Sequence, residues 1–173
     1  MPGAPWLERA AAVTLNRMET VELISASSDD TERAAGAVAE ALERGDVVLV
    51  SGDVGTGKTT FVRGACGALR VSSRVTSPSF TIGRRYDGAV PVSHVDLYRL
   101  DSLATEDPAL LDDYLTADVV AFIEWPDAAR AELEPERVAL HVRLAHMGTD
   151  RRLVTATGRH ELVGRLGRAL PAA

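Results

Sequence analysis

The sequence predicts an α/β fold: a three-layer sandwich whose central sheet is mostly parallel, with antiparallel strands at its edges. Three observations support this prediction. Strand-like and helix-like patterns alternate along the chain. The apolar runs Val47–Val50 and Val119–Ile123 have the composition of strands buried on both faces, which is typical of parallel sheets. The glycine-rich segment Gly52–Gly57 joins the first run to a helix-like segment.

Periodicity and turn residues predict the individual elements. Alternating apolar residues predict a strand over Thr20–Ile24. Capping residues at Ser27–Asp30 precede an Ala-rich helix over Thr31–Glu43, which Gly45 ends. The other predicted strands are Val47–Val50, Thr81–Tyr86, Val90–Val95, Val119–Ile123, Val138–Leu144 and Leu153–Thr157. The other predicted helices are Lys58–Leu69, Leu103–Leu115 with a break at Pro108, and Glu161–Leu170.

At 173 residues the chain is long enough for one domain with a sizeable core. We expect residues 20–173 to form this domain and residues 1–19 to be a disordered N-terminal extension. No apolar run is long enough to span a bilayer, and Met1–Arg17 lacks the apolar core of a secretory signal. We therefore expect a cytoplasmic protein without a membrane partner. The single cysteine, Cys66, excludes an internal disulfide and a cysteine-based metal site, and its place in a helix favours a buried apolar role.

The segment GDVGTGKTT, which follows the first buried strand, matches the phosphate-binding P-loop pattern G-x-x-x-x-G-K-T. Lys58 is the only lysine among 19 Lys and Arg residues, which marks a position that needs a compact ammonium. In this P-loop NTPase reading, Lys58 contacts the β- and γ-phosphates, Thr59 offers its hydroxyl to Mg²⁺, and Thr60 donates to the α-phosphate. A glycine loop that only caps a helix is the alternative, but it explains neither the lysine nor the threonine. The predicted nucleotide-binding residues of this loop are Gly52, Asp53, Val54, Gly55, Thr56, Gly57, Lys58, Thr59 and Thr60.

Two acidic residues, Asp96 and Glu124, follow apolar strands at the edge where the P-loop is expected. A carboxylate there suits a metal site or a bound nucleophile, and pairing with an arginine such as Arg99 is the alternative. We expect His94 to be a core residue, and we leave Trp125 open between stacking on a ligand and core packing.

The net charge of −6 and the pI of about 5.2 argue against direct binding of nucleic acid. Arg84–Arg85 and Arg151–Arg152 are candidates for a local basic face, with solvated strand edges as the alternative. A guanine-specific GTPase is excluded, because its Asn/Thr-Lys-x-Asp motif needs a second lysine. A small-metabolite kinase is disfavoured, because the 101–113 loop is acidic where such enzymes commonly carry an Arg-rich lid.

Together these motifs resemble the TsaE family, the bacterial ATPases of tRNA threonylcarbamoyladenosine biosynthesis. The resemblance extends from about Ser28 to Arg152. It depends on the P-loop and on the segments Val75–Thr81, His94–Leu100 and Ile123–Pro126. The run Ala104–Asp112 lacks the family's usual Glu-Leu-x-x-x-Gly, which leaves any partner contact there open.

The resemblance implies roles for particular residues and for partners. Thr59 and Glu124 would hold Mg²⁺, Asp96 would orient the attacking water, and Ser77–Thr81 would be a switch-like loop facing the γ-phosphate. Asp29 and Thr31 would lie near the adenine of ATP or ADP, and Arg151 near the nucleotide from the other side. Asp127 is counted with the nucleotide-binding residues, at a position where the family more often has Glu. Such a protein would be a weak ATPase alone, acting with the TsaB and TsaD proteins and meeting tRNA only through that complex.

Two other functions stay open at this point. A free-standing P-loop kinase would transfer phosphate to a small metabolite without protein partners. A nucleotide-sensing adaptor would bind ATP but scarcely hydrolyse it, so that its biological activity would survive Asp96→Asn.

Overall fold

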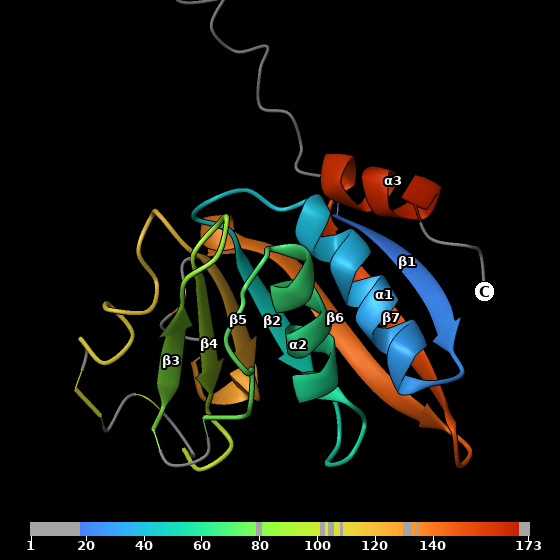
Figure 1. The fold of residues 1–173 in the computed structure, drawn as a ribbon, viewed down its shortest axis with the longest axis horizontal. Helices are drawn as coiled ribbons and strands as arrows, with labels where there is room; N and C mark the ends of the chain where they lie inside the picture. Colours follow the sequence, from blue (N-terminus) through green and yellow to red (C-terminus); the bar gives the residue numbers. More distant parts are fainter. Residues whose placement is uncertain are drawn as a thin grey trace, which may run out of the picture.

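The computed structural model describes residues 18–78, 81–100, 103, 106–107, 109–129, 133 and 135–169. A seven-stranded sheet runs through the molecule in the order β1-β7-β6-β2-β5-β4-β3 (Figure 1). The strands are β1 (Met18–Ser25), β2 (Val47–Ser51), β3 (Gly83–Tyr86), β4 (Val92–Asp96), β5 (Val120–Glu124), β6 (Val138–Met147) and β7 (Arg151–Arg159). The α-helices are α1 (Ser28–Glu40), α2 (Lys58–Ala68) and α3 (His160–Ala169).

The centre of the sheet is parallel, and its edges are antiparallel. Strands β4, β5, β2 and β6 run parallel to their neighbours, while β3 pairs antiparallel with β4 and β7 pairs antiparallel with β6 and β1. The predicted fold class is therefore confirmed. The register of β4 with β5 places Asp96 opposite Glu124, so both carboxylates lie at the carboxyl edge of the parallel strands.

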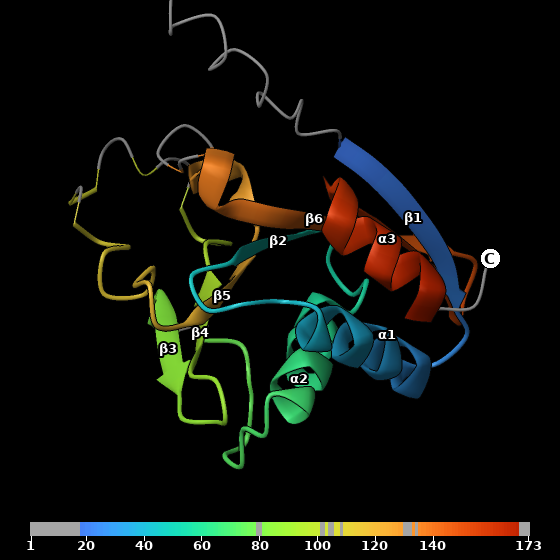
Figure 2. The ribbon, with the colours of Figure 1, turned by 90° about the horizontal axis from the view of Figure 1, so that it is seen from above.

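The three α-helices of the described residues lie on one face of the sheet (Figures 1 and 2). Phe61 and Val62 of α2 are fully buried in a core shared with Phe122 and Val50 of the sheet. A second core covers the opposite face, where Ile123 packs with Leu97 and other apolar residues of the loops. Within the described residues, the layer on that face contains turns and the short 3₁₀ helices η2 (Pro126–Ala129) and η3 (Pro135–Arg137), with no α-helix.

The predicted helix over Leu103–Leu115 is wrong for the residues that the structure describes there. They form successive turns. Leu110 N–H donates to Asp107 O at 2.9 Å, and Asp112 N–H donates to Ala109 O at 3.0 Å. The Asp107 carboxylate also accepts from Ala109 N–H at 2.9 Å. Such local side-chain bonds compete with helix formation, and Pro108 lacks the N–H that a helix interior needs.

The ends of the other elements differ from the sequence prediction by a few residues. β1 begins at Met18, two residues before the predicted strand, and residues 1–17 lie outside the described range. α1 begins at Ser28 because Ser27 is its N-cap: the Ser27 hydroxyl accepts from Asp30 N–H at 3.1 Å.

Helices α1 and α2 approach each other closely at Gly64. A Cβ atom on Gly64 would lie 2.4 Å from Cα of Glu32, so only glycine fits at this crossing. The crossing fixes α2, whose first residue is Lys58, against the first helix.

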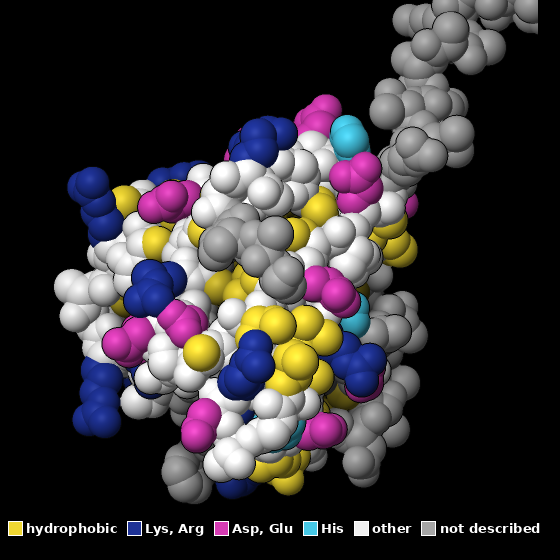
Figure 3. Space-filling view, turned by 90° about the vertical axis from the view of Figure 1, so that its right-hand side faces the viewer, with side chains coloured by type: hydrophobic (Ala, Val, Ile, Leu, Met, Phe, Trp, Pro, Cys, Tyr) yellow, Lys and Arg dark blue, Asp and Glu magenta, His cyan; other side chains and the backbone are white. Residues whose placement is uncertain are grey.

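Acidic and basic side chains are intermixed on the side that carries β1 and α3 (Figure 3), so this side has no continuous basic surface. Within the described residues, none of the helices has the length and apolar character needed to cross a membrane.

Candidate functional site

The loop between β2 and α2 has the backbone conformation of a phosphate-binding loop. Gly52, Gly55 and Gly57 all have positive φ angles, of 139°, 78° and 99°, which glycine adopts without strain. Inside the loop, Thr56 donates through both its N–H and its hydroxyl to Asp53 O, at 3.3 and 2.8 Å. Gly57 is the N-cap of α2 and supplies no side-chain acceptor. Amides in the first turn of α2 are thus left for an external anion.

Lys58 points back into this loop. Its Nζ donates to Gly52 O at 2.7 Å and to Asp53 O at 2.8 Å, and it lies 3.8 Å from the centre of the Trp125 ring. The residue is only 5% exposed. Burial lowers the pKa of Lys58, while the carboxylates of Glu124, Asp96 and Asp53 act in the opposite direction.

A cavity of about 410 Å³ opens beside Lys58. It is bounded by the loop, the start of α2 and the carboxyl ends of β4 and β5. The lining residues are Val54, Gly55, Gly57, Lys58, Thr59, Thr60, Ser77, Asp96, Tyr98, Glu124 and Trp125. The sequence-predicted Lys58, Thr59, Asp96 and Glu124 are therefore brought together around one space.

Glu124 is the most deeply buried carboxylate of this site, at 2% exposure. Thr59 Oγ1 donates to it, with distances of 2.9 Å to Oε1 and 3.2 Å to Oε2. Nε2 of the fully buried His94 lies 2.8 Å from Oε1. A hydroxyl and an imidazole thus hold a carboxylate that would be costly to bury without partners.

Asp96 occupies the cavity wall next to Glu124. Its Oδ2 accepts from the Ser77 hydroxyl at 2.6 Å, and its Oδ1 accepts from Tyr98 N–H at 3.1 Å. The bond to Ser77 ties the start of the predicted switch-like loop to β4. Residues 79 and 80 of that loop lie outside the described range.

Trp125 follows Glu124 with a left-handed backbone conformation, φ 56°. Non-glycine residues adopt this region at a cost of about 1–3 kcal/mol, and such residues concentrate at functional sites. The Trp125 ring packs on Tyr98, with centroids 4.9 Å apart, and faces Lys58. Trp125 is thus a wall of the cavity as well as part of the second core.

The groups around the cavity fit a nucleotide polyphosphate with Mg²⁺. Unpaired amides at a helix start and one ammonium suit phosphate oxygens. Within the described residues, no three His, Cys, Asp or Glu side chains gather as metal ligands. One carboxylate and one hydroxyl are nevertheless a suitable set for Mg²⁺, which keeps several waters and takes its remaining ligands from phosphates.

A smaller cavity of about 160 Å³ lies on the other side of the loop. Thr31, Thr56 and Thr60 contribute to its wall, together with Asp150 and Arg152 near the start of β7. Gly55, Gly57 and Thr60 line both cavities, so the two spaces adjoin across the loop.

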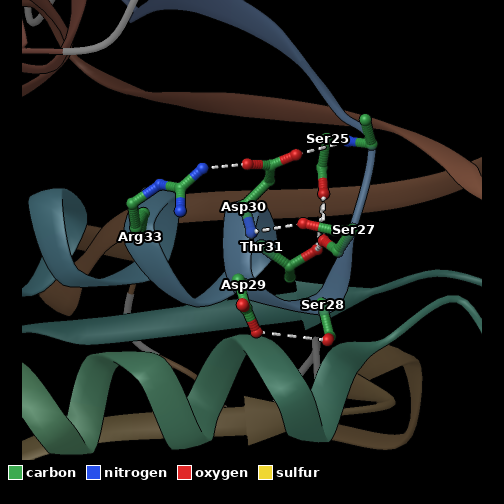
Figure 4. Close-up of polar contacts among 8 residues, drawn as sticks. Ser25, Ser27, Ser28, Asp29, Asp30, Thr31 and Arg33 are labelled. Atoms are coloured by element: carbon green, nitrogen blue, oxygen red, sulfur yellow. Dashed lines mark hydrogen bonds and ion pairs between the residues drawn. The ribbon is translucent and has the colours of Figure 1, made fainter.

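The predicted residues around this second cavity are only partly brought together. Thr31 lines it, but its hydroxyl bonds Ser25 Oγ at 2.7 Å and Ser27 O at 3.2 Å (Figure 4). Asp29, Asp127 and Arg151 line neither cavity, whereas Arg152, the neighbour of Arg151, lines the smaller one. The roles of those three residues stay predictions without geometric support.

The sequence analysis assigned no role in the site to His94, Tyr98 or Arg152. The sequence did contain a signal that could have placed His94 beside the site. It lies two residues before Asp96 on the same strand, and alternate residues of a strand share a face.

Comparisons with known proteins agree with the family resemblance of the P-loop and of the segments that contain Asp96 and Glu124. The family model for "Threonylcarbamoyl adenosine biosynthesis protein TsaE" matches residues 25–154. The protein of that name from Bacillus subtilis is 34% identical over 141 residues, covering 81% of this chain and 87% of its own length. Its counterpart from Streptomyces coelicolor is 39% identical over 127 residues, covering 70% of this chain and 85% of its own length. The crystal structure of YdiB from Bacillus subtilis superposes with a TM-score of 0.74 at 29% identity, covering 88% of this chain and 97% of YdiB.

Proposed function

The chain belongs to the TsaE family, and we propose that it binds and hydrolyses ATP with Mg²⁺ in the biosynthesis of threonylcarbamoyladenosine on tRNA. One observation carries the proposal: Thr59 and Glu124 meet at hydrogen-bond distance beside Lys58, in a loop whose glycines adopt positive φ angles. That arrangement suits a nucleotide polyphosphate and its cation.

In the proposed mode of binding, the polyphosphate lies in the larger cavity. Lys58 would direct its ammonium to the β- and γ-phosphates. These phosphates would compete for the ammonium with its present acceptors, the carbonyls of Gly52 and Asp53. Thr60 and the first-turn amides of α2 would contact the phosphates nearer the ribose. The smaller cavity adjoins across the loop, and we assign the nucleoside to it, with Arg152 and Thr31 at its wall.

Thr59 and Glu124 would hold Mg²⁺, which offsets phosphate charge as the bond to the γ-phosphate breaks. Asp96 would orient the attacking water. Its carboxylate lines the same cavity and is fixed by Ser77 and by the amide of Tyr98, so it can present an acceptor in a constant position.

We further propose that TsaB and TsaD are the protein partners, that tRNA is met only through their complex, and that the protein works in the cytoplasm. Val54 and Tyr98 are large apolar residues at the cavity, 68% and 61% exposed. Such exposure beside a site suits a surface that a partner covers. The net charge of −6 favours protein partners over direct contact with tRNA phosphates.

Phosphate release tests the proposed function. We expect the purified chain to release phosphate from Mg·ATP slowly, to accelerate when TsaB and TsaD are added, and to lose turnover on Asp96→Asn. Transfer of the γ-phosphate to a small metabolite without those partners would identify a kinase instead. Full complementation of a deletion strain by Asp96→Asn would identify a nucleotide-sensing adaptor.

A further inference from the structure

His94 is a fully buried imidazole that contacts the proposed magnesium site through one atom. It lies on β4, two residues before Asp96, on the strand that pairs with β5. Its exposure is 0%, and Nε2 lies 2.8 Å from Oε1 of Glu124. Nδ1 makes no hydrogen bond within the described part of the chain. The polar contact of this ring is therefore directed at Glu124.

The direction of the hydrogen bond follows from the partners. As a magnesium ligand Glu124 would be ionised, and an ionised carboxylate can only accept, so Nε2 would be the donor. Oε1 of Glu124 then has two donors, His94 Nε2 at 2.8 Å and Thr59 Oγ1 at 2.9 Å, while Oε2 has the longer contact to Thr59 at 3.2 Å. The carboxylate is held mainly through one oxygen, and its rotation about the last side-chain bond is restricted.

We propose that His94 is a positioning residue that fixes the Glu124 carboxylate for Mg²⁺ binding. This inference rests on the proposed function, because it assumes that Glu124 is a magnesium ligand. Carboxylates that bind metals are commonly held by further hydrogen bonds, and loss of such a bond lowers metal affinity about 10–100-fold. His94 would thus act on the affinity for Mg²⁺, with no contact to the nucleotide itself.

Two substitutions separate the hydrogen bond from the packing of the ring. In His94→Gln the amide nitrogen reaches about as far as Nε2, so a donor to Glu124 is kept. In His94→Asn the side chain is shorter and its amide ends near the position of Nδ1, so that donor is lost. His141→Asn is a matched control, because His141 Nε2 makes a 2.8 Å bond to Ser51 in the same sheet without lining either cavity.

The measurement is ADP binding by calorimetry, with Mg²⁺ and with a chelator, on the full-length chain. We expect Mg²⁺ to tighten ADP binding for the wild type, His94→Gln and His141→Asn. For His94→Asn we expect a roughly tenfold higher Mg²⁺ concentration for half-maximal tightening. The affinity for ADP under chelator should be the same in all four proteins. A purely structural role of His94 would instead lower the melting temperature and weaken ADP binding equally under both conditions.

Three results would overturn the inference. One is a wild-type Mg²⁺ response in His94→Asn, which would leave the proposed function standing. The second is an equal loss in His94→Asn and His94→Gln, which would mean that ring packing matters and the donor does not. The third is the absence of any Mg²⁺ effect in the wild type, which would remove the proposed magnesium site as well. Should His94→Asn not fold, His94→Leu replaces it as the variant of similar size without a donor.

Discussion

Replacing Thr59 with valine removes one hydroxyl and leaves the shape of the side chain nearly unchanged. Thr and Val have similar helix propensities, so the substitution at the start of α2 isolates the bond to Glu124. That hydroxyl has one proton to share between Oε1 at 2.9 Å and Oε2 at 3.2 Å, so a single hydrogen bond to a carboxylate is lost. Bonds to charged groups contribute about 1.5–3 kcal/mol.

The lower end of that range applies at Thr59. The residue is partly exposed to the cavity, so water can replace part of the lost bond, and His94 still donates to Glu124. We therefore expect Thr59→Val to lower the free energy of unfolding by about 1.5 kcal/mol. For a chain of this length, that loss corresponds to a melting temperature roughly 3–6 °C lower.

Thermal unfolding without ligand and calorimetry of ADP with and without Mg²⁺ are the two assays. Thr59→Val should also abolish the tightening of ADP binding by Mg²⁺, and Thr59→Ser, which keeps the hydroxyl, should retain it. An unchanged melting temperature together with a full Mg²⁺ response in Thr59→Val would refute both roles assigned to the Thr59 hydroxyl, the hydrogen bond to Glu124 and the binding of Mg²⁺.

Further predictions concern the helices, the cysteine and the second acid. Gly64→Ala should destabilise the fold by about 1–3 kcal/mol, because its Cβ would meet the backbone of Glu32 at 2.4 Å. In the same helix Gly67→Ala should stabilise by about 0.5–1 kcal/mol, since nothing lies within 4 Å of its Cβ; denaturant unfolding compares the two. Burial raises the pKa of Cys66 to about 12, so an aromatic disulfide reagent at pH 8 should label it only after unfolding. Because the unfolded thiol loses its proton near its ordinary value of 9.0, stability should also fall as the pH rises above that value; rapid labelling of the native protein would contradict the burial. Asp96→Asn should keep ADP affinity in calorimetry while phosphate release is lost, and loss of ADP binding instead would mean that Asp96 serves the nucleotide.

The parts of the fold that could be predicted have strong local signals. The β2 and β5 strands are continuous apolar runs because both of their faces are covered, and the glycine loop that follows β2 has a fixed spacing. Asp96 and Glu124, which line the larger cavity, could be singled out because a carboxylate after a buried strand needs a partner or a ligand.

The parts that could not be predicted depend on contacts between distant segments. His94 and Glu124 are 30 residues apart, and only the parallel register of β4 with β5 brings them together. Arg151 and Arg152 are adjacent on β7, where successive side chains point to opposite faces, so the sequence alone does not show that Arg152 is the one that lines the smaller cavity.

The central claim is that the loop from Gly52 to Thr60 binds the phosphates of ATP through its amides and through Lys58. Calorimetry with Mg·ATP on the wild type and on Lys58→Ala tests it directly. The account predicts saturable binding by the wild type and an affinity roughly 10–100-fold lower for Lys58→Ala. A decrease of that size corresponds to the loss of one or more hydrogen bonds between charged groups. No heat of association with the wild type, or equal affinity for the two proteins, would contradict it.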